Sequence, residues 1–109
     1  MLAILLFCIM AQTKDGLILE KDLERTSETL KAVAHPVRLQ IVNLLMNGEC
    51  SVGELVNTLG TKQSLTSQQL SILKSRKVLK SRRNGNVVFY ALVNKGVRNI
   101  MESILKEIP

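Results

Sequence analysis

Residues 51–73, SVGELVNTLGTKQSLTSQQLSIL, constrain the fold most, because they carry start and stop signals for two short helices. Ser51 and Glu54 form the Ser-x-x-Glu pattern of a capping box, which predicts that a helix begins there. Apolar residues then recur at three- and four-residue spacing, and Gly60 is the residue type that commonly ends a helix. Thr61 is expected to cap a second helix over about 62–75. The stretch therefore predicts two helices joined at Gly60.

The second of these helices is expected to turn Leu65, Leu70 and Leu73 inward. Small or polar side chains then remain around its N-terminal half: Lys62, Gln63, Ser64, Thr66, Ser67 and Gln68. Side chains of this kind match base edges and phosphates, and the N-terminal end of a recognition helix is the end that enters the major groove. The pattern predicts a helix-turn-helix that contacts DNA through these residues. Taken alone, the same helix is explained equally well as a solvated surface.

The following residues favour the DNA-binding interpretation. Strand-like runs at 78–80 and 87–93 flank the sequence Arg82-Arg83-Asn84-Gly85-Asn86. Asn-Gly between two such runs is a strong hairpin signal. Helix, turn, helix and hairpin is the order of elements in a winged helix.

Three further helices are expected outside this module. Leu19, Leu23, Thr26, Leu30 and Val33 mark a helix of about fifteen residues with one largely apolar side. Pro36 begins another, which ends at Met46 and is expected to bury Val37, Ile41, Leu44 and Leu45. A last helix of about fourteen residues repeats apolar side chains with helical period: Val97, Ile100, Met101, Ile104, Leu105 and Ile108.

The predicted fold class is therefore α+β, mostly α: a winged helix-turn-helix of about five helices and a two-stranded hairpin. Residues 15–109 are expected to form one DNA-binding domain with terminal dimerisation helices, because apolar stripes at both ends suggest a symmetric dimer. Arg38 is expected to point away from the core, where contact with a phosphate and a plain surface position are both open.

Basic residues are concentrated in the predicted module. The formal net charge is +6, yet residues 55–101 contain nine lysines and arginines and no acidic residue. The nine are Lys62, Lys74, Arg76, Lys77, Lys80, Arg82, Arg83, Lys95 and Arg98. A charge run is usually a solvated face, but this one coincides with the helix-turn-helix and hairpin, as expected for a nucleic-acid partner.

The first fourteen residues begin with the apolar run MLAILLFCIMA. The run is too short to span a bilayer and no positive charge precedes it, so neither a membrane anchor nor a signal peptide is expected. We interpret residues 1–14 as a disordered leader or a start-site artefact with Met10 as the true start. A helix extension within a subunit contact is the alternative.

Cysteine and histidine are too few for the usual reactive sites. Cys8 and Cys50 form no metal-ligand spacing, and free thiols in a reducing cytoplasm are expected. Cys50 is a candidate redox residue if it meets Cys8, and otherwise a small half-buried side chain before a helix. His35, the only histidine, is expected to be satisfied at a helix start rather than to bind metal. No catalytic triad, phosphate-binding glycine loop or carboxylate cluster is present, so no enzyme and no cofactor are predicted.

Four segments resemble the ArsR/SmtB family of winged-helix repressors: LKAVAHPVRLQIVNLL, GECSVGEL, QSLTSQQLSILKSRKVL and NGNVVFYAL. The resemblance covers nearly the whole chain after the leader. It implies a homodimer whose two recognition helices bind an imperfect palindrome of double-stranded DNA, with Arg82 and Arg83 in the wing. It also implies release of the operator by an inducer. Metal-binding members carry ligands where this chain has Ser51, Gly53, Asn94 and Gly96, so the resemblance implies no metal site and leaves the effector open.

The sequence thus predicts a cytoplasmic transcriptional repressor. A winged helix that binds nucleic acid without reading its sequence, or that binds a protein, remains the alternative. Challenge of the bound complex with excess random duplex distinguishes the two, because a sequence-blind binder then loses its target.

Overall fold

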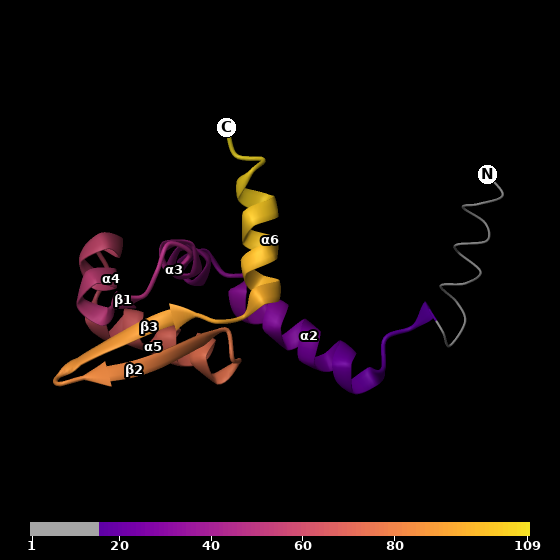
Figure 1. Ribbon diagram of the computed structural model, residues 1–109, viewed down its shortest axis with the longest axis horizontal. Helices are drawn as coiled ribbons and strands as arrows, with labels where there is room; N and C mark the ends of the chain where they lie inside the picture. Colours follow the sequence, from indigo (N-terminus) through magenta and orange to yellow (C-terminus); the bar gives the residue numbers. More distant parts are fainter. Residues whose placement is uncertain (1–15) are drawn as a thin grey trace.

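The computed structural model describes residues 16–109, which form five helices and three strands (Figure 1). Their order is α2 (Glu20–Val33), α3 (Pro36–Leu45), β1 (Cys50–Ser51), α4 (Val52–Leu59), α5 (Gln63–Ser75), β2 (Leu79–Asn84), β3 (Val87–Leu92) and α6 (Lys95–Leu105). The predictions for residues 1–14, including Cys8 and Met10, lie outside this range.

The strands form one antiparallel sheet with the order β1-β3-β2. β2 and β3 pair from Leu79 opposite Leu92 to Asn84 opposite Val87, and Gly85 takes the left-handed conformation of the turn with φ 64°. The predicted two-stranded hairpin is confirmed, and a short third strand that was not predicted joins it, because Cys50 and Ser51 pair with Tyr90 and Phe89. A strand of two residues is too short to show the alternating apolar pattern from which a strand is predicted.

The turn of the helix-turn-helix follows the predicted local signals. The Glu54 amide donates to Ser51 Oγ at 3.1 Å and the Ser51 amide donates to Glu54 Oε1 at 3.0 Å, which completes the capping box. Gly60 ends α4 in the left-handed conformation with φ 67°. The prediction of Thr61 as the next cap was wrong, because Lys62 takes the N-cap position of α5 without a side-chain hydrogen bond.

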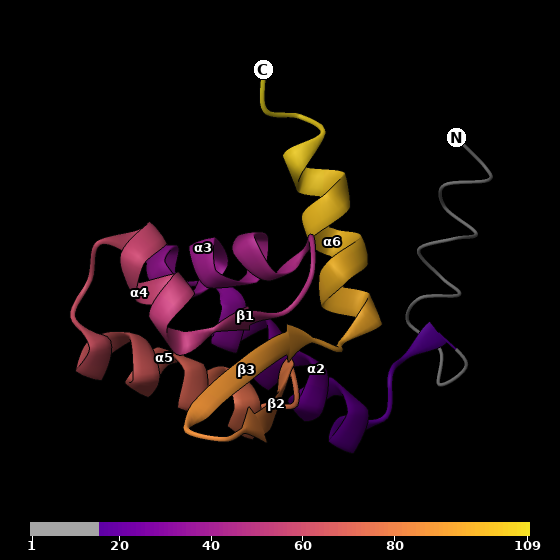
Figure 2. The same cartoon turned by 60° about the vertical axis from the view of Figure 1, so that its left-hand side comes forward.

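The core lies where α3, α4 and α5 meet the base of the sheet, an arrangement that Figure 2 shows from a second side. Its fully buried apolar side chains come from all of these elements: Ile41, Val42, Leu45, Leu55, Leu70, Leu73 and Val78. Burial of one such side chain stabilises the fold by about 1.5–3 kcal/mol. Val37 and Leu44, predicted to be buried on α3, pack only at the edge of this core.

The two terminal helices leave much of their apolar sides uncovered. On α2 only Ala32 and Val33 are buried, whereas Leu19 and Leu23 are 65% and 52% exposed. On α6 Val97 and Met101 are buried, whereas Ile104 is 53% exposed. Figure 1 shows both helices leading away from the remaining elements. None of the helices within residues 16–109 has the length and apolar character needed to cross a membrane.

Candidate nucleic-acid interface

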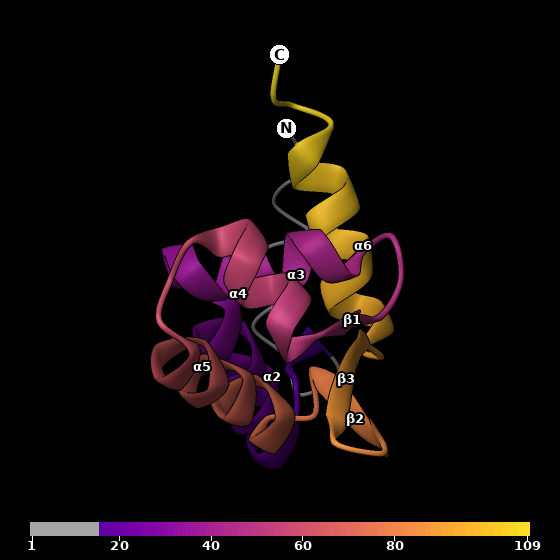
Figure 3. The same cartoon turned by 90° about the vertical axis from the view of Figure 1, so that its left-hand side faces the viewer.

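Helix α5 has one buried and one exposed side. Thr66, Gln69, Leu70 and Leu73 are buried, and their spacing of three, four and seven residues places them on one side of the helix. The exposed side chains of its N-terminal half are Gln63, Ser64, Leu65 and Gln68, with Ser67 half-buried beside them. Figure 3 shows α5 next to the β2–β3 hairpin, and β2 packs directly against α5. The exposed row therefore lies on a helix that is flanked by the wing.

Two residues of α5 were assigned to the wrong side. Thr66, predicted to face DNA, is 0% exposed, and its Oγ1 shares a hydrogen bond of 2.7 Å with Thr61 Oγ1. Leu65, predicted to be in the core, is 40% exposed. The physical reason is that threonine completes the buried stripe with Gln69, Leu70 and Leu73, since its hydroxyl has a partner and its methyl group packs. Position 65 falls beside that stripe.

Arg38 was also placed wrongly, because its side chain turns inward. Its Nε donates to Gln69 Oε1 at 2.7 Å and its Nη1 donates to the Ala32 carbonyl at 3.0 Å. These bonds join the end of α2, α3 and the middle of α5. A plain surface position therefore does not describe this half-buried arginine, whose hydrogen bonds tie the candidate reading helix to α2. Gln69 was missed, although its place three residues after Thr66 marks it as part of the buried stripe.

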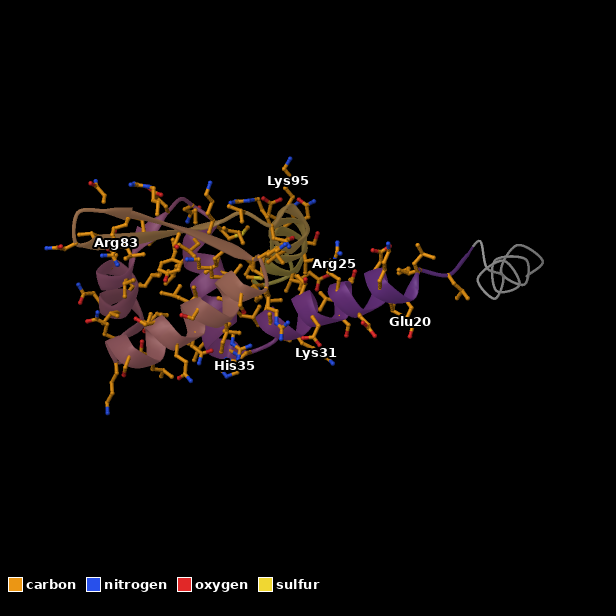
Figure 4. All side chains as sticks on the ribbon, turned by 90° about the horizontal axis from the view of Figure 1, so that it is seen from below. Glu20, Arg25, Lys31, His35, Arg83 and Lys95 are labelled. Carbon is orange, nitrogen blue, oxygen red and sulfur yellow. The ribbon has the colours of Figure 1, made fainter. Side chains whose placement is uncertain are left out.

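Three of the nine basic residues at 55–101, a segment here called the basic window, are bonded to other groups of the protein. Arg76 pairs with Glu28 at 3.1 Å, Arg82 pairs with Glu49, and Arg98 donates to the Met46 carbonyl at 2.9 Å. Both carboxylates come from outside the window. Of the nine basic residues at 55–101, six are exposed and make no ion pair with any residue of 16–109: Lys62, Lys74, Lys77, Lys80, Arg83 and Lys95. Figure 4 shows Arg83 on the hairpin, at the opposite end of the molecule from Glu20 on α2.

The wing arginines differ in their surroundings. Arg82 donates from Nε to Glu49 Oε2 at 3.0 Å and from Nη2 to Glu49 Oε1, and its Cζ lies 4.5 Å from the centroid of the Phe89 ring. The hydrogen bonds from Arg82 lower the pKa of the Glu49 carboxyl, and the same bonds raise the pKa of Arg82. Arg83 is exposed and lies next to Arg82 on β2.

Cys50 is half-buried before α4, as one of its two predictions stated, whereas His35 differs from its expected surroundings. The Cys50 thiol is half-buried, and burial, followed by the Glu54 charge, raises its pKa. A raised pKa lowers the thiolate fraction at neutral pH, so these surroundings do not activate the thiol. His35 precedes α3, and its buried Nδ1 has no hydrogen-bond partner among residues 16–109, which differs from the expectation of a satisfied histidine. Within the part of the chain that the structure describes, no three His, Cys, Asp or Glu side chains are grouped to hold a metal ion.

Comparisons with known proteins agree with this geometry. Residues 35–76 match the model of the family described as bacterial regulatory protein, arsR family. The biofilm growth-associated repressor of Xylella fastidiosa is 36% identical over 86 residues, which cover 79% of this chain and 75% of that protein. Among solved structures, HlyU from Vibrio cholerae superimposes with a TM-score of 0.76 at 35% identity, covering 81% of this chain and 96% of that one.

A second similar structure is the homodimeric winged helix-turn-helix DNA-binding domain of a possible ArsR-family regulator from Mycobacterium bovis. It has a TM-score of 0.72 at 28% identity and covers 83% of this chain and 85% of that domain. The matched family segment contains α3, α4 and α5, the elements that build the helix-turn-helix. The identity and coverage of the relatives confirm the resemblance seen in the sequence: the chain belongs to the ArsR family of winged helix-turn-helix transcriptional regulators.

Proposed function

We propose that the protein is a cytoplasmic, homodimeric transcriptional repressor that binds an imperfect palindromic operator in double-stranded DNA. The observation that carries the proposal is a polar row on the N-terminal half of a helix beside the wing, here called the reading ridge: the exposed Gln63, Ser64 and Gln68 and the half-buried Ser67. Its amide and hydroxyl groups are the types that pair with base edges in the major groove. The name of the Xylella relative as a repressor supports the direction of regulation.

The uncovered apolar sides of α2 and α6 support a dimer. Large apolar side chains on both helices are 41–53% exposed, and apolar surface of this extent is typically covered by a partner. The related domain from Mycobacterium bovis is homodimeric. In a two-fold dimer the two α5 helices would engage half-sites about one helical turn apart, roughly 34 Å.

The contacts divide into two classes. We assign base contacts to the reading ridge and phosphate contacts to Lys62, which precedes α5, and to Arg83 in the wing. Thr66 is removed from the predicted set, because a side chain with no exposed surface has no access to a groove. Arg82 is available to a phosphate only to the extent that it leaves Glu49.

Selection of binding sequences from a pool of random duplexes tests this proposal. We expect enrichment of an inverted repeat whose half-sites are centred about one helical turn apart. Affinity for that duplex should fall steeply with salt, with a log–log slope of about −0.9 for each phosphate contacted. Recovery of no common sequence, or loss of the enriched duplex to random competitor, would instead support a sequence-blind binder.

The proposed repressor also requires a signal that releases it. The family resemblance supports an effector, and its class is open among metal ions, oxidants, persulfides and other small molecules. Repeating the binding measurement on the enriched duplex with each of these, and with a chelator, sorts the classes. A cysteine-dependent response should disappear in Cys50→Ser, whereas a response that survives this substitution excludes Cys50 as the sensor.

A further inference from the structure

Arg82 reaches Glu49 across the whole width of the sheet. Arg82 lies on β2 and Glu49 immediately precedes β1, and β3 runs between these two strands. In the strand register Arg82 stands opposite Phe89, and Phe89 stands opposite Ser51. Side chains opposite one another share a face of the sheet, and Glu49, two residues before Ser51, has the same parity. The guanidinium therefore crosses β3 over the Phe89 ring to meet the carboxylate.

Three contacts hold the Arg82 guanidinium in this position. Two hydrogen bonds join it to both oxygens of Glu49, and the ring of Phe89 lies 4.5 Å from its Cζ. A two-point bond to a carboxylate is the geometry that a guanidinium would also offer to a phosphate. Glu49 and a DNA phosphate would consequently compete for the same donors.

Arg83 has the opposite parity on β2 and stands opposite Val88. Its side chain belongs to the other face of the hairpin, and it makes no ion pair among residues 16–109. The wing thus contains two adjacent arginines, of which one has its charge compensated within the protein and one does not.

We propose that Glu49 is a positioning residue that withholds Arg82 from DNA, so that each wing contacts the phosphate backbone through Arg83 alone. This inference rests on the proposed DNA-binding function. As a consequence, the wing binds the DNA backbone more weakly than it would if both arginines contacted phosphates. Glu49 determines this difference in affinity.

The bonded pair of Arg82 and Glu49, here called the clamp, can be tested without DNA. The Glu49 side-chain carboxyl is followed by NMR during a pH titration of the full-length wild-type protein and of Arg82→Ala. We expect the pKa of Glu49 to be below the ordinary glutamate value in the wild type and to return toward it in Arg82→Ala, with Arg83→Ala as the matched control that leaves it unchanged. Equal Glu49 pKa values in all three proteins would overturn the clamp.

The effect on DNA is read from the salt dependence of affinity for the enriched duplex. Arg83→Ala should reduce the magnitude of the log–log slope by about 0.9 for each bound wing, and Arg82→Ala by less than half as much. Glu49→Gln and Glu49→Ala should tighten binding and steepen the slope, because Arg82 is released. Glu107→Gln removes an acidic charge from the C-terminal end and is the control for net charge.

The double variant Glu49→Ala/Arg82→Ala completes the test. It should lose the gain in DNA affinity shown by Glu49→Ala, because the released arginine is no longer present. Equal slopes for Arg82→Ala and Arg83→Ala, or a Glu49→Ala protein that binds no tighter than Glu107→Gln, would overturn the inference. If the wild type shows no salt-dependent binding to any duplex, the proposed function fails, while the carboxyl titration still decides whether the clamp exists.

Discussion

The two sides of α5 use the same residue types for opposite purposes. Gln69 and Thr66 lie on the buried side, where Gln69 Oε1 accepts a hydrogen bond from Arg38 and the Thr66 hydroxyl shares one with Thr61. Gln68 and Ser64 lie on the exposed side, where the protein offers them no such partners among the hydrogen bonds of the described chain. We infer that a polar side chain of α5 is available for contact with DNA only if it is not already bonded within the core. Neighbouring substitutions on the two sides should therefore have separable effects.

The largest difference is expected between two leucines. Leu70 is 0% exposed, and Leu70→Ala should lower the free energy of unfolding by about 3 kcal/mol, because it removes buried contacts and leaves a cavity. Leu65→Ala should cost less than about 1 kcal/mol, since a half-exposed site loses little burial. Urea denaturation at one fixed protein concentration compares the two. A cost for Leu65→Ala close to that of Leu70→Ala would show that Leu65 belongs to the core after all.

Two adjacent glutamines provide the next comparison. Gln69→Leu removes the acceptor of the Arg38 hydrogen bond and should destabilise the fold by about 2 kcal/mol, the range for bonds to charged groups. Gln68→Leu should change the free energy of unfolding by less than about 0.5 kcal/mol, because the side chain is exposed. Thermal and urea unfolding measure both. Equal costs would contradict the assignment of the two glutamines to different sides.

The smallest expected effect on stability concerns the two hydroxyl groups of the turn. Thr66→Val keeps the buried methyl groups but removes the bond to Thr61, so a loss of about 1 kcal/mol is expected. Its specific DNA affinity, measured where the protein is fully folded, should stay close to that of the wild type. Ser64→Ala is the matched control and should show the reverse: unchanged stability and weaker specific binding. A large loss of specific affinity in Thr66→Val would restore Thr66 to the reading surface.

The parts of the fold that the sequence predicted are those specified by neighbouring residues. The capping box of Ser51 and Glu54, the helix end at Gly60 and the hairpin turn at Gly85 each depend on a few consecutive positions. The strand β1, the inward turn of Arg38 and the burial of Thr66 depend on partners far away in the sequence or on a hydroxyl pair across the turn. Residue type alone does not reveal these partners.

The electrostatic prediction was limited for the same reason. A window of sequence counts the charges within it, but Glu28 and Glu49 fold onto Arg76 and Arg82 from outside. Exposed ion pairs of this kind contribute little to stability, yet they change which cations are free for a phosphate. The assignment of individual DNA contacts to the reading ridge, Lys62 and Arg83 stays a prediction until binding is measured.

The most direct test of the account compares wild type and Gln68→Ala on two DNAs, the duplex enriched by selection and a random duplex of equal length, at one salt concentration. A base contact contributes about 1–3 kcal/mol of discrimination. We therefore expect Gln68→Ala to lose roughly 5- to 150-fold in affinity for the enriched duplex and to keep its affinity for the random one. An equal loss on both DNAs, or no loss on either, would contradict a reading ridge on the exposed side of α5.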